Sequence, residues 1–338
     1  FGEQDSQSVY FLNQESVTRM DVVKYLTQGI TRYLQSDETA EQEAQHRFHQ
    51  QQSHHFEEPN LPDTPSFGRE SSGGDDNLVD LYSVNLNERA RAGKLDPVIG
   101  RSEELDRSVQ VLCRRRKNNP LFVGEAGVGK TAMAEALAQM IVDKKVPKVL
   151  SYCTVYSLDL GSMLAGTKYR GDFEKRFKAV LKALGKHSGA IIFIDEIHNL
   201  VGAGSATGGT MDAANLIKPL LSSGELRCMG ATTYEEYRNF ISKDHALLRR
   251  FQKVDIVEPS KEETITILSG LKDRFESFHE VSYSDSALER TVELSARYMP
   301  DLHLPDKAID IIDEVGALQQ LQPPHKRRRV IRNRDVEA

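Results

Sequence analysis

The chain has 338 residues, enough for about two domains with connecting segments. Its 50 acidic residues outnumber its 44 lysines and arginines, and this net charge of -6 argues against a nucleic-acid binder that relies on a basic surface. No apolar run approaches the ~20 residues that span a bilayer, and no secretory signal pattern opens the chain. Cys113, Cys153 and Cys228 lie too far apart for a CxxC metal clamp or a disulfide framework, which favours a reducing, cytoplasmic compartment.

The N-terminal part of the chain is predicted to add little to a folded core. One helical pattern runs from Thr18 to Gln28, and we expect residues 1–34 to be the remnant of a larger N-terminal domain. The residues that follow are polar and rich in Gln, Glu, His and Ser, so residues 35–91 are predicted to be a flexible linker. Histidines within this linker are irregularly spaced and lack cysteine or acidic partners, which favours a solvated segment over a metal site.

From residue 92 the pattern changes to short apolar runs that alternate with amphipathic stretches. This alternation predicts an α/β domain over residues 92–258, with a parallel sheet flanked by helices. A capping pair, Ser260 and Glu263, opens the next segment, so residues 259–320 are predicted to form a small all-helical domain. Residues 321–338, which include a basic run, are expected to be a second linker. The predicted strands are Leu121–Val123, Cys153–Leu158, Ala190–Ile194, Leu226–Ala231 and Lys253–Val257.

A phosphate-binding loop lies between the first predicted strand of this domain and the helix that follows. Its glycines let backbone N–H groups surround phosphates, and the helix N-terminus adds positive charge. Lys130 would supply a point charge to the terminal phosphates, and Thr131 a hydroxyl ligand for Mg²⁺. The loop reads Gly124-Glu125-Ala126-Gly127-Val128-Gly129-Lys130-Thr131.

Two carboxylates, Asp195 and Glu196, directly follow the apolar run Ala190–Ile194. Paired acids at a strand end often belong to a solvated loop, but here they follow a phosphate loop at a suitable distance. Asp195 is therefore predicted to hold the water shell of Mg²⁺ beside Thr131. Glu196 is predicted to activate the water that attacks the terminal phosphate.

Three further motifs allow two interpretations each when the residues are taken alone. Thr233, at the end of a predicted strand, could bind the attacking water or the γ-phosphate, or belong to a turn. Arg249 and Arg250 could be a surface pair, or arginine fingers whose fork geometry stabilises transition-state charge. The segment Gly166–Gly171 places an aromatic side chain between two cations in a loop bracketed by glycines, which favours exposure of that side chain; it could have a function, or it could be an ordinary loop.

Together these motifs resemble the first AAA+ module of the Clp/heat-shock unfoldases, over about Gly93 to Gly316. Their order and spacing agree with that family almost without gaps. After Glu314 the chain reaches Pro323-Pro324 and a basic stretch instead of a long coiled coil, which resembles the peptidase-partnered branch more than the disaggregases. The remaining segments that carry the likeness are Leu95-Asp96-Pro97-Val98-Ile99-Gly100-Arg101, Lys168-Tyr169-Arg170, Arg249-Arg250-Phe251 and Leu304-Pro305-Asp306-Lys307-Ala308-Ile309-Asp310.

The resemblance implies an AAA+ P-loop NTPase with a helical lid, acting as a cytoplasmic homo-hexamer that hydrolyses ATP with Mg²⁺ and threads unfolded proteins through an axial pore. It implies a second ATPase module that docks a ClpP-type peptidase, and an N-terminal domain that binds an adaptor, with no nucleic-acid or membrane partner. The carried-over positions are Val98 and Ile99 for adenine, Thr233 for the first sensor, Arg249 and Arg250 for a neighbour's nucleotide, and Lys168, Tyr169 and Arg170 for the threaded chain.

Two alternatives stay open at the level of sequence. Many AAA+ lids carry a Gly-Ala-Arg sensor, whereas the matching helix here has Lys307, which could replace it. As an isolated fragment, the chain could also be a nucleotide-binding assembly switch with little ATPase activity of its own. A GTPase switch is less favoured because no Asn-Lys-x-Asp stretch follows the phosphate loop. A DNA-loading ATPase is less favoured because the overall charge is acidic.

Overall fold

The computed structural model describes residues 74–165, 170–202, 214–223, 226–323 and 325–337. The predicted N-terminal remnant, most of the first predicted linker, and the predicted polypeptide contacts Lys168 and Tyr169 lie outside these residues. Among the described helices, none combines the length and the apolar composition that a membrane span would need.

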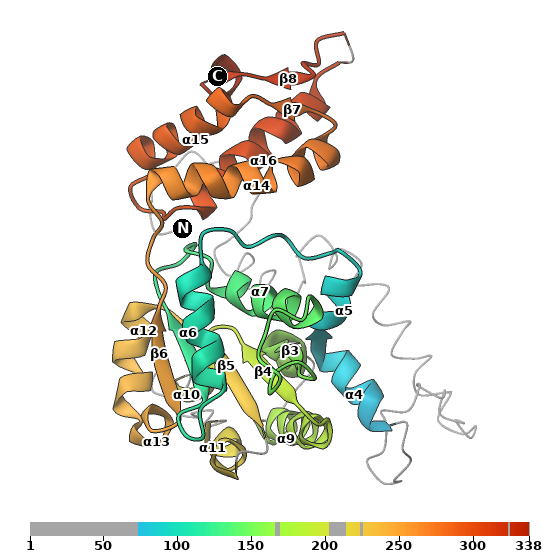
Figure 1. Cartoon of the computed structure of the whole chain (residues 1–338), viewed down its shortest axis with the longest axis vertical. Coiled ribbons are helices and arrows are strands. Elements are labelled where there is room, and N and C mark those ends of the chain that lie inside the picture. Colours follow the sequence, from blue (N-terminus) through green and yellow to red (C-terminus); the bar gives the residue numbers. More distant parts are fainter. Residues whose placement is uncertain (1–73, 166–169, 203–213, 224–225, 324, 338) are drawn as a thin grey trace, which may run out of the picture. The chain divides into compact units, whose positions relative to one another are not determined.

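A six-stranded sheet forms the centre of the α/β domain, in the order β1-β3-β4-β5-β2-β6 (Figure 1). The first strand pairs antiparallel with β3, and the other four pairings are parallel. The predicted fold class is therefore confirmed. The strands are β1 (Ser83–Asn85), β2 (Asn119–Val123), β3 (Thr154–Leu158), β4 (Ala190–Ile194), β5 (Arg227–Thr232) and β6 (Phe251–Asp255).

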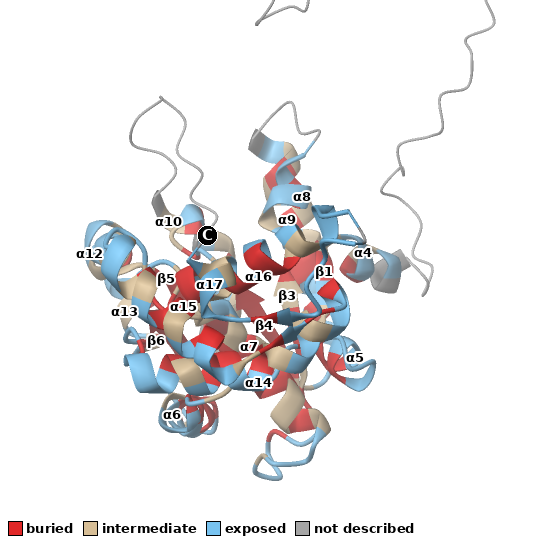
Figure 2. Ribbon diagram, turned by 90° about the horizontal axis from the view of Figure 1, so that it is seen from above, coloured by how far each residue is buried: buried red, intermediate tan, exposed pale blue. Residues whose placement is uncertain are grey.

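Helices cover both faces of this sheet. They are α4 (Gly74–Tyr82), α5 (Leu86–Arg91), α6 (Ser102–Leu112), α7 (Lys130–Val142), α8 (Leu160–Leu164), α9 (Arg170–Lys186), α10 (Asn199–Gly202), α11 (Ala214–Ser223), α12 (Tyr234–Asn239), the 3₁₀ turn η2 (Ile241–Lys243) and α13 (His245–Leu248). In β4, Ile191 and Phe193 enter the core on the α7 side, whereas Ile192 and Ile194 enter the core on the α9 side. This twofold alternation is what a strand between two helical layers requires. Figure 2 shows the buried strands and the exposed outer surfaces of α5, α6 and α12.

A second, mainly helical domain follows β6. Its elements are α14 (Lys261–His279), β7 (Ser282–Tyr283), α15 (Asp285–Tyr298), α16 (Asp306–Leu321), β8 (Val330–Ile331) and α17 (Asn333–Val336). The predicted capping pair starts α14: the Ser260 hydroxyl accepts the Glu263 N–H at 3.1 Å, and the Glu263 carboxylate accepts the Ser260 N–H at 2.7 Å. Leu268, Leu288 and Ile312 lie in the core that α14, α15 and α16 share.

The first predicted linker extends too far along the chain. Within residues 35–91, β1 adds an edge strand to β3, and α5 buries Leu86 and Ala90 in the core that α7 shares. The buried amide of Asn87 accepts the Val155 N–H and donates to the Cys153 carbonyl, both at 3.0 Å, which fixes α5 to the start of β3. A three-residue strand is too short to show a period of two, so the pattern gives no sign of it.

The second predicted linker, residues 321–338, also contains folded structure. Strand β8 pairs parallel with β7, and Ile331 is completely buried in the helical domain. The basic run Lys326–Arg329 leads directly into β8, so these residues belong to the helical domain.

Candidate active site

A cavity of about 510 Å³ opens at the carboxyl ends of the parallel strands, where ligands bind in sheets of this kind. Three neighbouring strands, β4, β5 and β2, each end in one predicted motif. Residues of the helical domain complete the wall. The cavity is lined by Val98, Ile99, Arg101, Ala126, Gly127, Val128, Gly129, Lys130, Thr131, Asp195, Glu196, Thr232, Thr233, Glu236, Ile267, Leu271, Phe275, Pro305, Asp306 and Ile309, among others.

The phosphate loop has the backbone that its glycines permit. Gly127 and Gly129 adopt φ angles of +80° and +94°, a region that other residues rarely occupy, and α7 then begins at Lys130. A Cβ atom at Gly127 would also lie 2.8 Å from the Asp306 Cβ, so only glycine fits beneath the helical domain. The loop is therefore shaped to present backbone N–H groups at a helix N-terminus.

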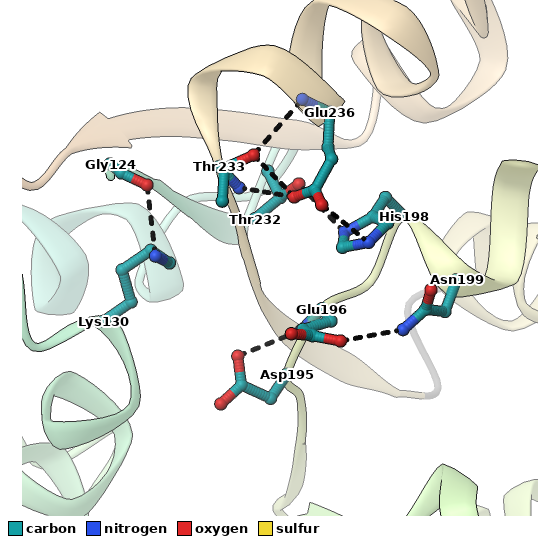
Figure 3. A network of polar contacts seen from close by, with 9 residues as sticks. All are labelled: Gly124, Lys130, Asp195, Glu196, His198, Asn199, Thr232, Thr233 and Glu236. Atoms are coloured by element: carbon teal, nitrogen blue, oxygen red, sulfur yellow. Dashed lines mark hydrogen bonds and ion pairs between the residues drawn. The ribbon is translucent and has the colours of Figure 1, made fainter. Parts of the chain in front are cut away.

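The Lys130 ammonium is held within this loop. Its Nζ donates to the carbonyl oxygen of Gly124 at 3.1 Å (Figure 3). It also donates to the carbonyl oxygen of Glu125 at 2.7 Å. Burial lowers the pKa of Lys130, while the nearby carboxylates, Asp195 first among them, oppose that shift. A half-buried ammonium at a helix N-terminus can bind an anion such as a phosphate through charge-assisted hydrogen bonds.

The two predicted Mg²⁺ ligands lie together. The Thr131 hydroxyl donates to an Asp195 carboxylate oxygen at 2.5 Å, although the residues are 64 positions apart. Hydroxyl and carboxylate oxygens are the donors that Mg²⁺ prefers, and Mg²⁺ usually takes only one or two protein ligands beside water and phosphate. The residues therefore fit this ion.

Glu196 is positioned by its neighbours on both sides. Its backbone has φ of +47°, and its N–H donates to the Asp195 carboxylate at 3.0 Å. The Asn199 amide donates to the Glu196 carboxylate at 3.1 Å (Figure 3). Asn199 was not predicted from the sequence; its place three residues after Glu196, across the turn that follows β4, was the available signal.

Thr233 begins α12 as its N-cap, and its partner is Glu236. The Glu236 carboxylate in turn lies 3.2 Å from His198 Nε2. Sequence reasoning missed both Glu236 and His198. The spacing Thr-x-x-Glu is the signature of a capping box and would have identified Glu236.

Val98 and Ile99, for which adenine contact stays a prediction, form part of the cavity wall. The Arg101 guanidinium holds this segment in place: it donates to the Val128 carbonyl at 3.1 Å and the Val257 carbonyl at 2.8 Å, and its side chain is buried. Gly270, on α14, lies against the end of the Ile99 side chain, so this helix packs directly on the segment that contains Val98 and Ile99.

Arg249 and Arg250 do not line the cavity. Arg249 ends α13 with an exposed side chain, and Arg250 is half-buried, with its carbonyl accepting a hydrogen bond from Asn119 at 3.1 Å. Of the predicted polypeptide contacts, Arg170 is the first residue of α9.

Lys307 serves the helical domain itself. Its ammonium donates to the carbonyls of Met299 at 3.1 Å and Leu302 at 2.8 Å, and the side chain is 6% exposed. It does not line the cavity, whereas its neighbour Asp306 does. In this arrangement the Lys307 ammonium is bound to carbonyl oxygens of the helical domain, and a role for it as second nucleotide sensor stays a hypothesis.

Comparisons with known proteins agree with this arrangement. Residues 120–258 match the ATPase family associated with various cellular activities (AAA), and residues 260–336 match the AAA lid domain. The whole chain is 49% identical to a ClpA homolog protein from Fuscovulum blasticum and covers 41% of it. Over 71% of this chain, identity to the chaperone protein ClpB 1 of Nostoc sp. is 57%, covering 28% of that protein.

Solved structures show the same relationship. A closed-state structure of Hsp104 with ATPγS and FITC casein matches with a TM-score of 0.70 and 45% identity, over 77% of this chain and 44% of that chain. An ADP complex of S. cerevisiae Hsp104 matches with a TM-score of 0.67 and 48% identity, over 71% and 34% of the two chains. The chain thus spans less than half the length of each of these relatives. Because residues 120–258 and 260–336 match the AAA and AAA lid families, and identity to a ClpA homolog extends along the whole chain, the chain belongs to the Clp/heat-shock family of AAA+ ATPases.

Proposed function

We propose that this chain is the ATP-hydrolysing module of a ring-forming protein unfoldase. The observation that carries the proposal is the convergence of three motifs in one cavity: the phosphate loop with Lys130, the Thr131–Asp195 pair, and Glu196 held by Asn199. Nucleotide complexes of the Hsp104 structures, one with ATPγS and one with ADP, support ATP as the substrate.

Each residue then has a defined task in the hydrolysis of ATP to ADP and phosphate. The loop N–H groups and Lys130 bind the phosphates, and Val98 and Ile99 contact the adenine. Thr131 and Asp195 would hold Mg²⁺, which when bound would supply positive charge to the phosphates. Glu196 accepts a proton from water as the water oxygen attacks the γ-phosphorus and the bond to ADP breaks.

Arg249 and Arg250 complete the site from a neighbouring subunit. Neither residue lines the cavity of its own chain, and Arg249 is exposed, which suits a group that stabilises the transition-state charge in trans. We therefore propose a homo-hexamer in which each nucleotide lies at a subunit boundary.

The work of this ring would be to thread unfolded proteins through an axial pore, with Tyr169 as the gripping aromatic side chain between Lys168 and Arg170. An aromatic ring suits this task because it contacts many sequences through apolar surface. The casein in an Hsp104 structure supports a polypeptide substrate. We further propose that the ring delivers the threaded chain to a ClpP-type peptidase in the cytoplasm, and that an adaptor binds the N-terminal domain; the chain is similar to a ClpA homolog along its entire length.

ATP turnover per subunit, measured with Mg²⁺ as the protein concentration is raised, tests the proposal. A rate that climbs and then saturates is expected, because the arginines act between subunits. Replacing Arg249 with Ala should abolish this rise and leave ATP binding intact. A flat, near-zero rate with intact ATP binding would instead identify the chain as a nucleotide-binding assembly switch.

A further inference from the structure

The side chain of Glu236 joins the two segments that carry the water-activating and sensor residues. Its Oε2 accepts the Thr233 N–H at 3.1 Å and the Thr233 hydroxyl at 2.6 Å. Its Oε1 lies 3.2 Å from His198 Nε2. His198 follows Glu196 after β4, whereas Thr233 follows β5, so one carboxylate connects two neighbouring strand ends (Figure 3).

The Glu236 carboxylate is ionised at neutral pH. Burial acts to raise its pKa, but hydrogen bonds from Thr233 and the charges of His198 and Lys130 together hold the pKa below its ordinary value. An ionised carboxylate only accepts hydrogen bonds, so the Thr233 hydroxyl must be the donor in the 2.6 Å contact. Glu236 therefore sets the direction of the hydroxyl hydrogen.

This direction decides what Thr233 can offer to a nucleotide in the cavity. A hydroxyl has one hydrogen and two acceptor lone pairs. The hydrogen is used by the Glu236 carboxylate, and one lone pair faces the Glu236 N–H at 3.3 Å. Through its remaining lone pair the hydroxyl can accept a hydrogen bond from water. It has no hydrogen left to donate to a phosphate oxygen. Of the two partners that the sequence left open for this hydroxyl, the attacking water fits.

We propose that Glu236 and His198 form a positioning pair that orients the Thr233 hydroxyl as a hydrogen-bond acceptor for the attacking water. The proposal rests on the ATP hydrolysis proposed above. One water hydrogen then goes to Glu196 as a proton, and the other stays on the water oxygen and is held by Thr233. His198 contributes by holding the second carboxylate oxygen of Glu236, and its own Nδ1 lies 3.3 Å from the Thr232 hydroxyl.

The test is a mutant cycle on single-turnover ATP hydrolysis in the assembled full-length protein, with Thr233→Val, Glu236→Ala and the double variant. Each single substitution is expected to slow hydrolysis by about tenfold or more, because each removes the oriented lone pair. The double variant should be no slower than Thr233→Val alone, because Glu236 acts only through that hydroxyl. Glu236→Gln should recover much of the rate, since its amide oxygen can still accept the hydroxyl hydrogen.

Binding of ADP and of ATPγS, followed by fluorescence titration, separates this role from a structural one. Both affinities should stay within about twofold of the wild-type values, because neither Glu236 nor His198 is needed to hold the nucleotide. Glu235→Ala is the matched control, since Glu235 lies beside Glu236 in the first turn of α12 with an exposed side chain. This control should hydrolyse ATP at the wild-type rate.

Additive slowing in the double variant would overturn the positioning pair, as would an equal loss of ADP and ATPγS affinity in Glu236→Ala. The failure of the proposed function has a different signature. In that case the wild-type protein itself would bind ATP without hydrolysing it, and both proposals would fall together. If the wild-type protein hydrolyses ATP and the Glu236→Ala variant does so at the same rate, only the positioning role of Glu236 and His198 would be overturned.

Discussion

At the scale of single residues, opposing effects act on the Lys130 ammonium in the cavity. Four carboxylates act on Lys130, those of Asp195, Glu236, Glu125 and Glu196, while its burial disfavours the charged form. In this structure the ammonium bonds to carbonyl oxygens of its own loop. A phosphate group offers stronger, charge-assisted hydrogen bonds than a carbonyl does, so a bound nucleotide would draw Lys130 toward itself.

Replacing Lys130 with Ala should abolish ATP binding, because the phosphates lose their main cation. Isothermal titration with ATP and Mg²⁺ would measure this loss. Lys148→Ala serves as the control, because Lys148 is an exposed lysine outside the cavity. Unchanged ATP affinity in the Lys130 variant would refute the phosphate-binding role.

Glu196→Gln should trap bound ATP without hydrolysing it, because an amide cannot take the proton from the attacking water. The Asn199 amide can still donate to the glutamine oxygen, so the geometry should survive. Bound nucleotide, extracted after one turnover time and separated by chromatography, would show ATP in the variant and ADP in the wild type. Normal turnover in the variant would mean that another group activates the water.

At the scale of elements, the helical domain begins with α14, whose first turn is stabilised by a capping box. Ser260 and Glu263 form the reciprocal hydrogen bonds that begin α14, and Leu271 and Phe275 on this helix reach the cavity wall. Hydrogen bonds from the Ser260 N–H and hydroxyl hold the pKa of Glu263 below its ordinary value of 4.5. The start of α14 thus fixes the register of the helix that closes one side of the cavity.

Ser260→Ala should lower the free energy of unfolding by about 1 kcal/mol at neutral pH, the usual cost of losing an N-cap. Since the folded-state pKa of Glu263 lies below its unfolded value, its contribution is present above about pH 4.5 and is lost as the pH falls further. The difference between variant and wild type, measured by urea denaturation, should therefore shrink in acid. Ser269→Ala, an exposed serine later in α14, should change stability little.

At the scale of the whole molecule, the described chain is an α/β domain followed by a lid whose helix α16 also faces the nucleotide cavity. Asp306 and Ile309 of α16 line this cavity together with the phosphate loop. Nucleotide binding would therefore involve both domains at once. In the proposed unfoldase, mechanical work on a polypeptide would further depend on Tyr169 and on the assembly of subunits.

Tyr169→Ala in the full-length protein should spare ATP hydrolysis and weaken the unfolding of a tagged substrate, because the aromatic grip is lost. Tyr169→Phe is the matched control and should retain unfolding, since it keeps the ring and removes only the hydroxyl. Loss of fluorescence from a stable tagged protein would report the rate. Intact unfolding in the alanine variant would exclude Tyr169 from the pore role.

The parts of the fold that could be predicted are those with strong local patterns. Ala190–Ile194 was predicted with its observed bounds because five buried apolar residues form one run. Strand β1 was missed because its three residues are held by pairing with β3, a contact distant in sequence. In the site, the phosphate loop and the acids follow local motifs, whereas the role of His198 arises only when β4 and β5 lie side by side.

The buried Arg101 side chain links the phosphate loop to the segment that leads into the lid. One rigid, planar guanidinium binds a carbonyl of the phosphate loop, at Val128, and a carbonyl of the segment that leads into the lid, at Val257. These two backbone points cannot move independently without breaking a buried, charge-assisted hydrogen bond. A shift of the phosphate loop when phosphate leaves would therefore have to move the start of the lid with it or break one of these two hydrogen bonds.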